Sequence, residues 1–128
     1  MANTPFLASG NNSNQVRYAR LDTTATGASA ISVGAANERG PASWVLHVKG
    51  NAWTGSIVPK LRLTGSDLTN TDLQQCIYYT AGDEAAVAAG TGITANGIYT
   101  IPCDRCDLFL EYTHTSGTVD VFAQSGAF

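Results

Sequence analysis

A Cys-x-x-Cys motif, from Cys103 to Cys106, is the part of the sequence whose residue types and spacing come nearest to a chemical site. Such a pair supplies half of the ligands of a structural zinc ion, and Cys76, His47 or His114 could in principle complete the set. The sequence has no second Cys-x-x-Cys and no His-x-x-x-His, and Cys106 begins an alternating strand where a redox motif would begin a helix. We therefore expect reduced thiols that pack as small apolar groups, without a metal or another cofactor.

Catalysis would have to come from the two histidines and the carboxylates. His47 lies on an expected strand, His114 falls in an expected loop, where a histidine is usually a surface group, and no Gly-x-Ser-x-Gly elbow is present. A glycosidase needs two carboxylates that face each other across a cleft, which sequence neighbours do not establish. The close carboxylate pairs are Asp67/Asp72, Asp83/Glu84 and Asp104/Asp107. We expect these carboxylates to be solvated loop residues. The chain is therefore predicted not to be an enzyme.

Aromatic residues point to binding. Trp44 alternates in phase with Leu46 and Val48, which predicts a core position. Trp53 lies in an expected turn, and Phe109 and Phe122 fall on the otherwise polar face of the last two strands. Exposed aromatics mark contact surfaces. We expect these residues to contact other molecules, the alternative being that a loop or the N-terminal segment covers them.

The elements that would position these side chains are short strands. Residues 106–113 and 118–124 alternate around His114-Thr115-Ser116-Gly117 and predict a C-terminal hairpin. Further strands are expected at 16–21, 31–33, 44–49, 57–63, 75–80, 93–95 and 98–101, with turns at 50–55 and at Asn96-Gly97. This pattern predicts an all-β fold, an antiparallel β-sandwich of about seven to nine short strands. Residues 1–14 are expected to form an extended arm with Phe6 and Leu7 as its large apolar groups, and residues 15–128 a single domain.

Composition excludes several classes of partner. The 128 residues carry a net charge of −3, and the seven lysines and arginines are scattered, so no nucleic-acid partner is expected. No apolar run approaches 18 residues, and no signal peptide is visible, so no membrane partner is expected. Three cysteines, an odd number, favour synthesis in a reducing cytoplasm. Only 13% of residues are charged, against about 25% in a typical protein. Much of the surface can therefore be removed from water at a small cost in free energy.

The order of several segments resembles a known class. Trp53-Thr54-Gly55, the strand 57–63, Gly65-Ser66-Asp67, Asn96-Gly97-Ile98-Tyr99 and Gly117-Thr118-Val119-Asp120-Val121 follow one another as in small jelly-roll-like β-sandwich proteins of tailed-bacteriophage virions. The likeness covers about residues 44–124 and is greatest to capsid cement or decoration proteins. It implies no catalysis, a position on the outer surface of the phage head, oligomers at its symmetry axes, and contacts that clamp neighbouring major capsid subunits.

These observations lead to one functional hypothesis and two alternatives. The first is a virion structural protein, made in the host cytoplasm, that binds the major capsid protein and itself as a dimer or trimer. The residues expected at its interfaces are Phe6, Leu7, Trp53, Phe109 and Phe122. The alternatives are a carbohydrate-binding or receptor-binding β-sandwich module of a phage tail, fibre or enzyme, and a small zinc protein or hydrolase.

Overall fold

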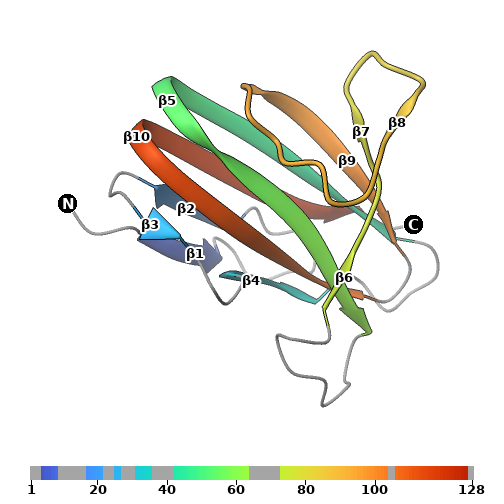
Figure 1. The fold of residues 1–128 in the computed structure, drawn as a ribbon. Coiled ribbons are helices and arrows are strands. Elements are labelled where there is room, and N and C mark those ends of the chain that lie inside the picture. Colours follow the sequence, from blue (N-terminus) through green and yellow to red (C-terminus); the bar gives the residue numbers. More distant parts are fainter. Residues whose placement is uncertain are drawn as a thin grey trace.

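The fold is built from strands alone. The computed structural model describes residues 4–8, 17–21, 25–26, 31–35, 42–63, 73–103 and 106–126. All pairing within these ranges is antiparallel, and one ten-stranded sheet curls into a half-barrel (Figure 1), which confirms the predicted all-β antiparallel class. The strands are β1 (Thr4–Ala8), β2 (Arg17–Leu21), β3 (Ala25–Thr26), β4 (Ile31–Ala35), β5 (Ala42–Leu63), β6 (Gln74–Gln75), β7 (Tyr78–Thr80), β8 (Ala86–Val87), β9 (Gly97–Cys103) and β10 (Cys106–Gly126).

Two long strands form the axis of the sheet. β5 has 22 residues and β10 has 21, and they pair with each other along almost their whole length. β2, β3 and β4 line up along the other edge of β10, while β9 and β6 line up along the other edge of β5. The main path through the sheet is therefore β1-β2-β10-β5-β9-β7-β8. Two strands of this length were not expected from a pattern that predicted short strands only.

Both long strands bend at the same place, which we call the corner: residues 50–55 of β5 and 114–118 of β10. His114 pairs with Gly55, Ser116 with Thr54 and Thr118 with Asn51, so each strand carries one extra residue between regular stretches of the ladder. Such bulges increase local bending. The predicted turn at 50–55 and the predicted C-terminal hairpin are therefore wrong. Bulges and turns use the same residue types, and here the residues interrupt two strands that pair with each other.

The bulges also keep the apolar side chains on one side of the sheet. In β5 the buried residues are Trp44, Leu46 and Val48 before the corner but Ile57 and Pro59 after it, a change from even to odd positions. β10 changes in the same way. One inserted residue reverses the alternation of faces, so the concave side stays apolar through the bend.

The core fills this concave side. Trp44 is fully buried, as predicted, and its Nε1 donates to the carbonyl oxygen of Cys106 at 3.3 Å. The core cluster joins both halves of the curled sheet through Trp44, Leu46, Val48, Ile57, Tyr78, Ile93, Tyr99, Ile101, Leu108, Leu110, Val119, Val121 and Ala123. Truncating one large member to alanine typically costs about 2–5 kcal/mol.

Two further local expectations differ from the structure. Asn96-Gly97 does not turn a hairpin: Ile93 bridges to Ile57 with N···O distances of 3.0 and 2.7 Å, while Gly97 begins β9 and pairs with Val48. In addition, part of the segment expected to be an arm, Thr4–Ala8, is strand β1 and pairs with β2. In both places pairing with another strand, β5 for residues 93 and 97 and the next strand β2 for Thr4–Ala8, outweighs the local turn or arm preference.

Candidate binding face

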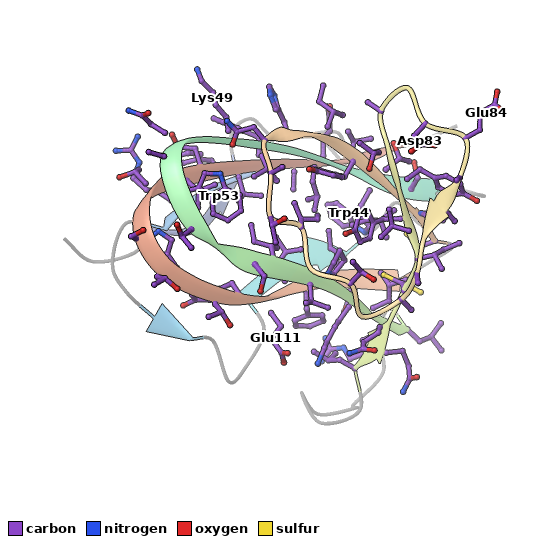
Figure 2. All side chains as sticks on the ribbon, turned by 45° about the horizontal axis from the view of Figure 1, so that its top comes forward. Trp44, Lys49, Trp53, Asp83, Glu84 and Glu111 are labelled. Atoms are coloured by element: carbon purple, nitrogen blue, oxygen red, sulfur yellow. The ribbon has the colours of Figure 1, made fainter. Side chains whose placement is uncertain are left out.

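One half of the convex side carries the candidate site. There the outward residues of β2, β10, β5 and β9 alternate with buried ones, and the register aligns them into rows across the sheet. Figure 2 shows Lys49 pointing away from the ribbon on this side, whereas Trp44 lies inside the curl. We call this surface the outer face. Its described members include Tyr18, Arg20, Val45, His47, Lys49, Ile98, Thr100, Asp120, Phe122 and Gln124.

An aromatic row crosses four strands of the outer face. Phe122 pairs with Tyr18 on one side and His47 on the other, and His47 pairs with Ile98. The Phe122 ring centroid lies 5.0 Å from that of Tyr18 and 6.2 Å from that of His47, in tilted arrangements that favour aromatic contact. Ile98 is 43% exposed. The predicted outward position of Phe122 is confirmed, although the ring is half-buried between its neighbours.

A charged row runs beside the aromatic row. Asp120 accepts hydrogen bonds at Oδ1 from Arg20 Nε at 2.7 Å and from the Tyr18 hydroxyl at 2.8 Å, and at Oδ2 from Arg20 Nη2 at 3.2 Å. The hydrogen bond from Arg20 holds the pKa of Asp120 below its ordinary value, with help from Tyr18 and the charge of Lys49. Burial, and then the hydrogen bond to Asp120, raises the pKa of Tyr18. The Asp120 carboxylate is therefore both ionised and fixed in orientation.

The two rows border a groove. A hollow of about 500 Å³ is lined by Val45, His47, Lys49, Asp120, Phe122, Ala123 and Gln124. A second hollow of about 250 Å³ is lined by Arg20, Lys49, Gly50, Asn51, Thr118 and Asp120. Both hollows are lined by Lys49 and Asp120, so they lie next to each other between the far end of the outer face and the corner, and we call the two together the outer groove.

Trp53, predicted to be exposed, is half-buried at the corner and packs against the core cluster. Its Nε1 donates to Asn96 Oδ1 at 2.8 Å. The same amide accepts from Gly50 N at 2.9 Å and donates to Gly50 O at 2.8 Å. Asn96 thus fastens the loop before β9 to the corner of β5, and the Trp53 indole serves this structural contact.

The predicted exposure of Phe109 is wrong. Only 5% of the residue is accessible, and the Arg62 guanidinium carbon lies 4.9 Å from the ring centroid. Arg62 Nη2 also donates to Asp107 Oδ2 at 2.8 Å. The alternation of β10 placed Phe109 on the convex side correctly, but a cation from a strand 47 positions away in sequence covers it. On this half of the convex side the aromatic ring is covered, whereas on the outer face the Phe122 ring lines the groove.

Phe6 and Leu7 lie on β1, where Leu7 pairs with Tyr18 through the backbone. Their side chains are outside the part of the chain that the structure describes. The predicted contacts of these two residues therefore remain predictions.

The three thiols come together at one end of the core, away from the outer groove. All three are reduced and partly buried, and Cys76 Sγ lies 3.6 Å from the carbonyl oxygen of Pro59. Burial raises the pKa of Cys76 to about 12, with a further contribution from Cys103 and Cys106, so this thiol is far from the reactive thiolate form. Within the described ranges, no group of three or more His, Cys, Asp or Glu residues is arranged to hold a metal ion.

His114 contradicts its predicted surface position. It is 2% exposed, because it lies within β10 at the corner and pairs with Gly55. His47, in contrast, is exposed on the outer face. It lies on the face of β5 opposite to Trp44 and Leu46, as the alternation along the strand predicted.

Comparison of the chain with family models, curated proteins and solved structures finds no match. In the described ranges there is no helix with the length and apolar character that a membrane span requires.

Proposed function

We propose that this chain is a non-enzymatic virion structural protein of the capsid cement or decoration class, which binds the outside of a phage head and stabilises contacts between major capsid subunits. The observation that supports it is the edge strand β1. β1 ends the strand order, and no described strand pairs with its outer side. Backbone amide and carbonyl groups on such an edge can pair with a strand of a neighbouring subunit.

Sequence and composition support the same proposal. Phe6 and Leu7 lie next to each other on β1, the strand that would meet a neighbouring subunit. A surface with few charges costs little to desolvate. An oligomer of this chain could stay bound to a shell through contacts that are weak individually. Once one contact has formed, the other contacts of the same oligomer form at a high effective concentration. The proposal includes a dimer or trimer of this chain and the jelly-roll-like sandwich of the class.

The test is binding to shells that lack the protein. Shells are purified from the phage that encodes this chain after its gene has been disrupted, and co-sedimentation is measured against protein concentration. We expect the full chain to saturate the shells, and a variant lacking residues 1–14 to need at least about tenfold more protein, which corresponds to the loss of roughly 1.4 kcal/mol per contact. Circular dichroism should show the same strand content in both proteins, apart from the segment removed.

Ile77→Ala serves as the control, because Ile77 is 40% exposed on a segment distant from β1 in the strand order. It should saturate the shells at the same concentration as the full chain. Equal saturation by the truncated and full chains, or no sedimentation of the full chain, would contradict the proposal.

A further inference from the structure

The outer groove has the size of a binding site for an extended molecule. Its two hollows, about 500 and 250 Å³, together fall in the range of ligand sites in proteins. It follows the strand direction from Val45 to Asn51, which at about 3.3 Å per residue amounts to roughly 20 Å. A ligand that fills it would be a chain of several linked units lying along β5 and β10.

Apart from Gly50 at the corner, whose backbone N and O are hydrogen-bonded to the Asn96 amide, the groove offers side chains and no free backbone groups. In the middle of a sheet the amide and carbonyl groups are used by the ladders, and here β10 is paired on both sides by β2 and β5. A peptide strand would bind at an edge such as β1, where backbone groups are available. The occupant of the outer groove must therefore be recognised by side-chain rings and side-chain hydrogen bonds.

The aromatic row provides apolar ring faces beside the groove. Phe122 and His47 both line it, and their rings are tilted by 49° to each other. Ring faces carry partial negative charge and attract weakly positive C–H groups. The C–H-rich face of a pyranose ring is flat enough to lie on such a ring, whereas its hydroxyl groups project from the rim.

The charged row supplies hydrogen-bonding groups for those hydroxyls. Asp120 is an acceptor that Arg20 and Tyr18 hold in place, and Lys49 adds donors, while the Gln124 amide, which lies beyond the aromatic row beside Val45, lines the other end of the same hollow. Each sugar hydroxyl can donate and accept, so it matches a mixture of both kinds. A fixed acceptor also reduces the ordering cost of binding.

From these features we propose that the outer groove is a carbohydrate-binding site that accepts a linear oligosaccharide, stacked on Phe122 and His47 and hydrogen-bonded to Asp120, Lys49 and Gln124. The site is separate from the edge strand β1, on which the proposed attachment depends. A decoration protein built in this way would be held by one edge and would present a glycan-binding face.

The test uses ¹⁵N-labelled full chain and five purified tetrasaccharides: cellotetraose, maltotetraose, chitotetraose, xylotetraose and tetragalacturonate. Amide shifts are followed in titrations up to roughly 10 mM, well above the concentration at which weak glycan complexes of about 1 mM dissociation constant form. We expect at least one probe to saturate, with shift changes concentrated in residues 45–51 and 118–124.

Three variants make the test specific. Phe122→Ala should weaken binding by about tenfold or more through the lost ring contact, whereas Phe122→Tyr, which keeps the ring, should bind nearly as well as the original chain. Ile77→Ala, an apolar truncation on an exposed surface away from the groove, should bind equally well. The amide spectrum of each variant shows whether it is folded.

The inference is overturned if none of the five probes changes the spectrum, if the changes lie outside the groove, or if Phe122→Ala and Ile77→Ala bind alike. Because no shell is present in this experiment, its outcome is independent of the co-sedimentation result. Failure of the glycan site and failure of capsid attachment can therefore be distinguished.

Discussion

Asp120 connects two strands of the outer face through its hydrogen bonds to Tyr18 and Arg20. The ion pair is partly exposed, with 41% of the Arg20 side chain and 22% of the Asp120 side chain accessible. Solvent screens such a pair, so its contribution to the free energy of unfolding is small, and the tyrosine hydroxyl adds a further hydrogen bond to the same carboxylate. A modest interaction of this kind still decides where the carboxylate points.

This carboxylate gives the protein a defined dependence on pH. The folded-state pKa of Asp120 is lowered from 3.8, chiefly by Arg20, so folding favours the ionised form. The stabilisation is fully present above the unfolded-state pKa and is lost as the pH falls through the folded-state pKa. We expect Asp120→Asn to lower the free energy of unfolding by about 1 kcal/mol at neutral pH and to have little effect well below pH 3.8.

Urea unfolding at neutral and acidic pH measures this difference. Glu84→Gln is the matched control, because it removes an exposed carboxylate from a loop, and its effect should be small at both pH values. A cost of Asp120→Asn that stays the same from neutral to acidic pH would show that the ionised carboxylate is not what stabilises the contact.

The corner is the element that turns two long strands into a curved sheet. Gly117 has φ 76° and Ala52 has φ 50°, both in the left-handed region that residues other than glycine avoid. A Cβ on Gly117 would lie 2.6 Å from Ala52 O and 2.6 Å from Trp53 Cα. Here the backbones of β5 and β10 approach so closely that only glycine fits.

Two glycine substitutions separate backbone conformation from steric contact. Gly82 has φ 82°, but a Cβ added there would meet no atom of the described residues within 4 Å, so Gly82→Ala should cost about 1 kcal/mol for the left-handed backbone alone. Gly117→Ala has the same backbone cost and a steric clash in addition, which adds about 1–3 kcal/mol. The two free energies of unfolding are measured by urea titration, and equal costs would mean that the corner is not closely packed.

Strand alternation predicts which side of an element is buried but not which elements are continuous. The phase of Trp44, Leu46 and Val48 is enough to place them in the core, because alternation is a local property. Whether Gly50–Gly55 ends a strand or bends it depends on what pairs beyond it. That partner is β10, more than 50 residues further along the chain, and nothing in the local sequence specifies it.

The same limit applies to the candidate site. Alternation assigns His47 to the face opposite Trp44, and Phe122 to the convex side. The contact of Tyr18 and Arg20 with Asp120 spans at least 100 positions and does not follow from spacing. Correlated variation of positions 18, 20 and 120 among related sequences is the kind of signal that would reveal this contact.

At the scale of the whole molecule, β5 and β10 run through both halves of the curled sheet, and the core cluster includes residues from each half. The two halves are not built from separate strands, because β5 and β10 each supply paired residues on both sides of the corner. Unfolding should therefore be a single cooperative transition, as in most domains of this size.

Hydrogen exchange can test this cooperativity across the corner. Leu110 lies in the first half of β10, is 2% exposed and pairs with Pro59, so Leu110→Ala should create a cavity and cost about 2–5 kcal/mol. If the halves unfold together, the slowest amides of residues 44–48, on the far side of the corner, should lose the same free energy of protection as those near the substitution. Loss of protection confined to residues 57–63 and 106–112 would instead mean that the half-barrel consists of two independently unfolding units, with the corner as a hinge between them.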